Sequence, residues 1–198
     1  EAQNFKIMVT PETATTKENW TDLMPYDKNI LVEGIDIFKD HMAISERKEG
    51  ITQLRIRPWD GKNEHYIEFG EASYTTGTGI NPEFETDLLR LEYTSLTTPN
   101  STYDYNVKTK KLELLKQQEV IGNFNASDYV TERKMDKATD GTMVPLSIVY
   151  KKGYKKDSTR PVLLYAYGSY GYSMDPYFSS ARLSLLNRGF GFAIAHIR

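Results

Sequence analysis

The chain has 198 residues, of which 39% are hydrophobic and 26% are charged, and its formal net charge is −2. The absence of cysteine excludes disulfide bonds, thiol catalysis and thiolate metal sites. No apolar run approaches the ~18 residues of a membrane-spanning helix, and the interspersed charges favour no polyanion-binding surface. We therefore expect a globular protein without a membrane or nucleic-acid partner. We place it in the cytoplasm, although the lack of cysteine is equally compatible with the periplasm.

Short alternating segments, rich in β-branched and aromatic residues, fill the first two-thirds of the chain. Examples are "HMAISER", "TQLRIRP" and "LLRLEYTSL", and turn residues such as Glu49-Gly50 and Asp60-Gly61 separate them. Almost nothing in this part has helical spacing. The pattern predicts antiparallel β-strands.

This strand pattern repeats when the chain is shifted by about 49 residues. Apolar–polar–apolar triplets that begin at Phe5, Leu54 and Tyr103 then coincide, and after a turn each is followed by another strand. A repeat of about 50 residues with four antiparallel strands is typical of a β-propeller blade. We expect the end of one blade in residues 1–27 and two more blades in residues 28–70 and 71–118. Chance similarity between alternating strands is the alternative.

After residue 118 the pattern changes. The segment "DYVTERKMDKATDGTMVPLSIVYKK" predicts a hairpin that turns at Asp140-Gly141. Two apolar runs, "PVLLYAY" and "FGFAIAHI", are typical of strands that are buried on both faces. Between them, "PYFSSARLSLLNRG" has helical spacing, with Phe178, Ala181, Leu185 and Leu186 on one face and Gly189 placed to end the helix. Residues 119–198 are therefore predicted to form an α/β layer.

Two and a half blades cannot close a propeller, which has roughly four to eight. The chain also starts in a strand pattern and stops directly after one. We expect an internal segment of a longer protein, with open sheet edges.

The stretch "YGSYG" raises the question of a nucleophile at Ser169. The nucleophile elbow of α/β-hydrolases has the pattern G-x-S-x-G, but here the glycines stand one position before and two positions after the serine. The histidine that follows, His196, lies in an apolar run and is predicted to be a structural residue. We therefore reject Ser169 as a nucleophile. A tyrosine of this turn could instead donate a hydrogen bond to an oxyanion, although packing is the simpler role for Tyr165, Tyr167 and Tyr170.

Long stretches of the chain resemble the prolyl oligopeptidase family of serine peptidases. They are "DGTMVPLSIVYKKG" with "RPVLLYAYGSYGYSMDPYFSSARLSLLNRGFGFAIAHIR", and, in the first part, "EGIDIFKDHMAISERKEG" and "GINPEFETD". The "YGSYG" form and "DYVTERKMDKATDGT" resemble the branch that cuts after Arg or Lys. The resemblance covers essentially the whole chain. It implies the last blades of a β-propeller in residues 1–118, followed by the start of an α/β-hydrolase peptidase domain in residues 119–198.

The resemblance also implies roles for two residues. Tyr167 would supply its hydroxyl to the oxyanion hole, and Asp175 would bind basic side chains of the substrate. For Asp175, the alternative is that it caps a helix that starts near Pro176. Some family members have a second acidic residue at the position of Tyr177, so binding of a second basic side chain is in doubt.

The implied partners are short basic peptides and the remainder of the parent chain, with no metal and no cofactor. The Ser-Asp-His triad is not within these residues, so the chain alone is predicted to be inactive. Two alternatives remain open. One is a relative that cuts after proline, and the other is a non-catalytic propeller that serves as a binding scaffold.

Overall fold

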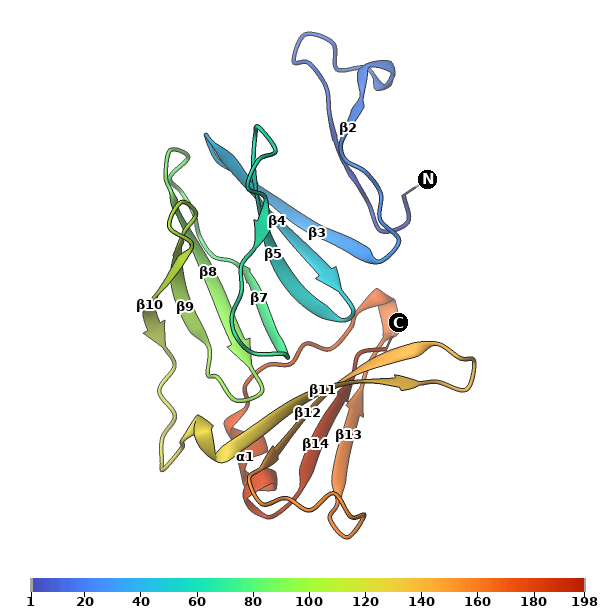
Figure 1. The fold of residues 1–198 in the computed structure, drawn as a ribbon, viewed down its shortest axis with the longest axis vertical. Helices are drawn as coiled ribbons and strands as arrows, with labels where there is room; N and C mark the ends of the chain where they lie inside the picture. The colour runs from blue at the N-terminus through green and yellow to red at the C-terminus, as the bar shows by residue number, and fades with distance from the viewer. Residues whose placement is uncertain (1, 198) are drawn as a thin grey trace.

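The computed structural model describes residues 2–197 of the chain (Figure 1). The residues form one two-stranded and three four-stranded sheets within this described range. The strands before residue 118 are β1 (Ile7–Val9), β2 (Thr21–Met24), β3 (Ile30–Ile37), β4 (His41–Lys48), β5 (Ile51–Pro58), β6 (His65–Tyr66), β7 (Tyr74–Thr78), β8 (Leu88–Ser95), β9 (Ser101–Asn106) and β10 (Lys111–Gln117). The later elements are β11 (Tyr129–Lys137), β12 (Met143–Lys151), β13 (Val162–Ala166), α1 (Ser180–Asn187) and β14 (Gly191–Ala195). Three short 3₁₀ turns cover Lys17–Asn19, Ala126–Asp128 and Ser169–Gly171.

The two sheets β3-β4-β5-β6 and β7-β8-β9-β10 are four-stranded antiparallel meanders. They fall within the predicted units 28–70 and 71–118. The triplets that begin at Leu54 and Tyr103 lie on β5 and β9, whereas the first triplet reaches β1 only with Ile7. Each is followed by the last strand of its unit, β2, β6 or β10. The prediction of repeated four-stranded antiparallel sheets is therefore confirmed, although β6 is much shorter than the apolar stretch suggested.

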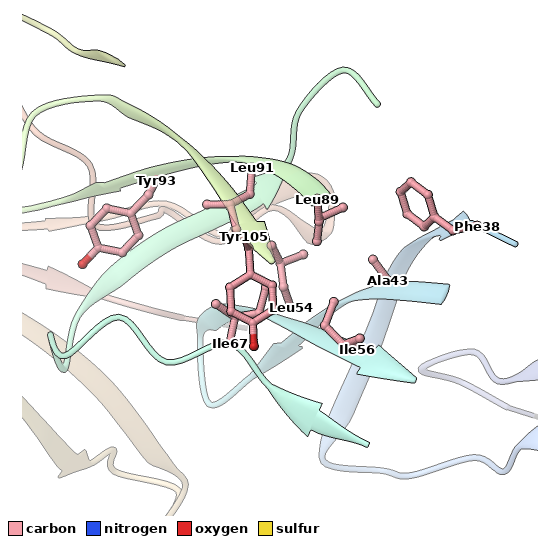
Figure 2. Close-up of a cluster of buried hydrophobic side chains, with 9 residues drawn as sticks. All are labelled: Phe38, Ala43, Leu54, Ile56, Ile67, Leu89, Leu91, Tyr93 and Tyr105. Atoms are coloured by element: carbon pink, nitrogen blue, oxygen red, sulfur yellow. The ribbon is translucent and has the colours of Figure 1, made fainter. Parts of the chain in front are cut away.

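The main core lies between these two sheets. Figure 2 shows Leu54 and Ile56 of β5 facing Leu89 and Leu91 of β8, and all four side chains are buried. Burying an aliphatic side chain of this size stabilises a fold by ~1.5–3 kcal/mol. The alternation along each strand places these residues on the inner face because successive side chains point to opposite sides. The two sheets therefore pack face to face through the buried side chains of their inner faces.

The last sheet has the order β11-β12-β14-β13. The β11–β12 hairpin is antiparallel, as predicted, while β13 and β14 run parallel, with Tyr165 opposite Ile194. Helix α1 connects β13 to β14 and packs Leu186 against Val149 and Phe192. One strand–helix–strand unit of this kind defines an α/β layer, but it is not a complete hydrolase fold.

The prediction that β13 is buried on both faces is wrong. All five of its residues are exposed, and Val162 and Leu164 retain 55% and 62% of their accessible surface. The reason is that β13 lies at the edge of its sheet, while α1 packs over β12 and β14. The second apolar run, in β14, is buried along its whole length, as predicted.

The helix also starts later than the sequence predicted. It begins at Ser180, with Ser179 as its N-cap, and Gly189 follows its end with a φ of 88°. Its buried residues are Arg182 and Leu186, whereas Ala181 is exposed. The buried face is therefore rotated relative to the predicted one.

Candidate functional site

The tyrosine turn follows directly after the last residue of β13. Tyr167 is the first residue beyond that strand, and a 3₁₀ turn then runs from Ser169 to Gly171. Tyr170 and Gly171 adopt left-handed conformations, with φ of 59° and 71°. This conformation is unfavourable for a residue with a side chain, and it is retained only where the surrounding structure requires it.

The side chain of Tyr167 keeps 41% of its accessible surface. Its ring packs edge-on against Tyr172, with the ring centroids 6.3 Å apart. Within residues 2–197 its hydroxyl makes no hydrogen bond. The phenol is therefore oriented by a ring contact, while its donor remains available.

Ser169 and His196 are not brought together by the fold. His196 is buried, and its ring nitrogens lie 2.6 Å from Ser147 Oγ and 2.8 Å from the carbonyl oxygen of Met174. The carbonyl can only accept, so we assign the proton to Nδ1, and Nε2 then accepts from the Ser147 hydroxyl. Burial lowers the pKa of His196 below its ordinary value. The prediction of a structural histidine is confirmed, and Ser147 is fully buried and closed to any substrate.

Asp175 forms an ion pair that the sequence did not predict. Arg47 Nη1 donates to its Oδ1 at 2.6 Å, and Nη2 approaches Oδ2 at 3.5 Å. Arg47 comes from β4, so this pair joins the first full blade to the segment that follows the tyrosine turn. Because Ser179 caps α1 four residues later, the capping role considered for Asp175 is wrong.

A second carboxylate supports the same arginine. Arg47 Nε donates to Glu33 Oε1 at 2.7 Å. Burial lowers the pKa of Arg47, but the hydrogen bonds and charges of Asp175 and Glu33 raise it, and the net direction is upward. The guanidinium is therefore a permanent charge between two carboxylates.

The turn between β4 and β5 docks beside this ion pair. Gly50 has a φ of 77° and lies so close to His196 that a Cβ atom added to it would be 2.6 Å from His196 Cβ. The guanidinium of Arg133 on β11 donates to the carbonyl oxygen of Glu49. The Glu49-Gly50 pair was recognised from sequence as a turn, but nothing local indicated what it would contact.

The structure thus brings Asp175, Arg47 and His196 together, and it leaves Tyr167 exposed at the neighbouring strand end. In the described part of the chain, no serine, histidine and carboxylate form a catalytic arrangement. A cavity of about 240 Å³ lies beside β13 and is lined by Tyr165, Tyr177 and Arg182 among others. No helix within residues 2–197 is long and apolar enough to cross a membrane.

The two four-stranded antiparallel sheets between β3 and β10 are consistent with blades of a β-propeller domain. The chain belongs to the prolyl oligopeptidase family, since the model of that family's N-terminal beta-propeller domain matches residues 1–118.

Among curated proteins, the chain is 44% identical over 198 residues to dipeptidyl aminopeptidase BI of Pseudoxanthomonas mexicana, covering 100% of this chain and 27% of that protein. It is 29% identical to protease 2 of Moraxella lacunata over 197 residues, which are 100% of this chain and 28% of that protein. Among solved structures, oligopeptidase B from Trypanosoma brucei superposes with a TM-score of 0.88 at 32% identity, covering 100% of this chain and 29% of that one. The chain therefore spans less than a third of these relatives.

Proposed function

We propose that this chain is part of a serine oligopeptidase that cleaves short peptides after Arg or Lys. Residues 1–118 would be the last propeller blades, and residues 119–198 would begin the α/β-hydrolase peptidase domain. The likeness to oligopeptidase B along the whole chain supports this assignment. The observation that carries it is the exposed Tyr167 hydroxyl just beyond the end of β13.

In this reaction a serine attacks the carbonyl carbon of the peptide bond. The carbonyl oxygen of the substrate then becomes negatively charged in the tetrahedral intermediate. Tyr167 would donate its hydroxyl hydrogen to that oxygen. A donor of this kind accelerates the reaction because it meets charge that develops only in the transition state. The serine, histidine and aspartate of the triad, and the pocket for the basic side chain, would come from the rest of the parent chain. Asp175 would contribute a carboxylate to the binding of basic substrates.

The test uses the full-length protein with N-terminally blocked fluorogenic peptides that end in Arg, Lys or Pro. We expect cleavage after Arg and Lys to exceed cleavage after Pro by at least about tenfold in kcat/KM, which is about 1.4 kcal/mol of discrimination. Faster cleavage after Pro would replace the proposal by the post-proline alternative, which the 29% identity to prolyl endopeptidase of Elizabethkingia meningoseptica favours. No cleavage of any peptide would favour the binding scaffold.

A second candidate is the release of dipeptides from free amino termini, because the relative with 44% identity is named a dipeptidyl aminopeptidase. The same peptides with a free rather than a blocked amino terminus test it. A strong preference for the free terminus would favour dipeptide release, whereas equal rates would favour the oligopeptidase.

A further inference from the structure

We propose that Arg47 is a specificity-determining residue, which occupies the Asp175 carboxylate and must be displaced before a cationic substrate side chain can bind there. This inference rests on the proposed function and deepens it. The propeller would then set how strongly a second basic residue in the substrate contributes to binding.

The ion pair has the geometry of a bound basic side chain. Both nitrogens at the tip of Arg47 face the two oxygens of Asp175, at 2.6 and 3.5 Å. The side chains retain only 16% and 24% of their exposure. Charge-assisted hydrogen bonds of a guanidinium to a carboxylate are among the stronger ones in proteins. A substrate arginine would need the same two oxygens, so it would compete with Arg47 for them.

Arg47 can leave Asp175 without becoming an unpaired buried charge. Its Nε remains bonded to Glu33, whose side chain is 31% exposed. In residues 2–197, by contrast, both hydrogen bonds to the Asp175 carboxylate come from Arg47. Displacement would therefore exchange one cation for another at Asp175, while Glu33 continues to compensate the guanidinium that was released.

Arg47 Nη1 also makes a long hydrogen bond of 3.4 Å to the carbonyl oxygen of Gly50 in the β4–β5 turn, but this turn does not depend on Arg47 alone. The β4–β5 turn is also held by the packing of Gly50 against His196 and by the hydrogen bond from Arg133 to Glu49. These contacts lie beside the ion pair and use other atoms. We therefore expect a substitution of Arg47 to release Asp175 while the turn stays docked.

The experiment compares two blocked fluorogenic peptides, Arg-Arg and Ala-Arg, and uses the full-length protein. The readout is the ratio of kcat/KM for Arg-Arg to that for Ala-Arg. In Arg47→Met we expect this ratio to rise about tenfold, the effect of one charge-assisted hydrogen-bonded pair. Arg47→Lys keeps the charge but not the forked geometry, so we expect a rise of about threefold. This second variant provides the test if Arg47→Met does not fold.

Two controls assign the effect to Asp175. Arg57 lies in the same blade and pairs with Glu64, so Arg57→Met should leave the ratio unchanged. Adding Asp175→Asn to Arg47→Met should return the ratio to that of the wild type. An unchanged ratio in both Arg47 variants, or a rise that persists with Asp175→Asn, would overturn the inference.

A binding measurement separates failure of this inference from failure of the proposed function. Arg-Arg amide should raise the melting temperature of Arg47→Met more than that of the wild type or of the double variant. If the protein cleaves neither peptide but this difference is seen, the peptidase proposal fails and competition at Asp175 stands. If the peptides are cleaved and substitution of Arg47 changes neither the kcat/KM ratio nor the melting temperature, the peptidase proposal stands and competition at Asp175 is wrong.

Discussion

The phenol of Tyr167 and the phenol of Tyr170 lie three positions apart in the same turn but in different surroundings. Tyr167 packs against the ring of Tyr172, while Tyr170 is 99% exposed. A donor oriented before the reaction stabilises the transition state without reorganisation, which a freely rotating side chain cannot do. Tyr170 is therefore a suitable control for a substitution of Tyr167.

We expect Tyr167→Phe in the full-length protein to lower kcat by about 100-fold or more, the usual effect of removing one oxyanion donor. The ring and its packing remain, so stability should be unchanged. Tyr170→Phe is the matched control and should keep the wild-type rate. Steady-state kinetics on a peptide ending in Arg checks both, and equal rates for the two variants would remove Tyr167 from the oxyanion role.

His196 couples the stability of this region to pH. Its pKa is lowered by burial, so the folded protein takes up the proton at a lower pH than the unfolded chain does. The unfolded state therefore binds more protons below a pH of about 6.5, and the free energy of unfolding must fall as the pH drops through that value. The pKa of the buried His41 is lowered for the same reason and acts in the same direction.

Denaturant titrations of the full-length protein at pH 7.5 and pH 5.5 should show this loss. Each histidine contributes at most about 1.4 kcal/mol per pH unit. His196→Gln removes one titrating group, so this variant should be less stable at pH 7.5 but should lose less on acidification. A pH dependence identical to that of the wild type would contradict the assignment.

The sequence predicted local roles at single residues better than distant ones. His196 stood in an apolar run, which is enough to indicate a buried structural histidine. Asp175 stood before a proline, which suggested a helix cap. Its actual partner, Arg47, lies 128 residues away in the chain, and no local pattern could indicate that contact.

Among the elements, the β4–β5 turn shows how a common motif acquires a particular role. Glu49 and Gly50 both adopt positive φ, as a tight hairpin turn requires. At Gly50 the absence of a side chain serves a second purpose, because the Cβ and Cγ atoms of His196 lie within 3 Å of the position that a Cβ would take. Gly61 also has a positive φ, 69°, but nothing lies within 4 Å of its Cβ position.

We expect Gly50→Ala to destabilise the protein clearly more than Gly61→Ala does. Both substitutions place a Cβ in the left-handed region, which costs roughly 1–2 kcal/mol. Only Gly50→Ala adds a clash with His196, so its excess cost reports the contact between the blade and the last sheet. Thermal unfolding of the two full-length variants checks this, and equal losses would show that the contact contributes nothing.

For strand β13, the sequence pattern predicted the strand itself but not its burial. A continuous apolar run indicates a strand, and the strand is present. It does not indicate the position of that strand in its sheet or what covers it. The blade sheets were easier to predict because their pairing is between consecutive strands, whereas β13 pairs with a strand beyond the helix.

At the scale of the whole molecule, residues 2–197 bring no serine, histidine and carboxylate together in a catalytic arrangement. We expect the isolated 198-residue chain to show no turnover of a fluorogenic peptide ending in Arg, under conditions in which the full-length protein is active. Both proteins are assayed at equal molar concentration. Cleavage by the isolated chain that a serine-directed inhibitor abolishes would show that the active residues had been wrongly assigned.

The strand order of the last sheet has a consequence for biosynthesis. β14 is synthesised after both β12 and β13, yet it occupies the interior position between them. The blades can form while translation continues, since domains generally fold as units and those nearer the N-terminus fold first. The strand that carries the tyrosine turn must wait for its neighbour, with its apolar side chains open to the solvent. In the nascent protein the apolar side chains of β13 would be accessible to chaperones, and the turn that carries Tyr167 would reach its native position only after β14 has been made.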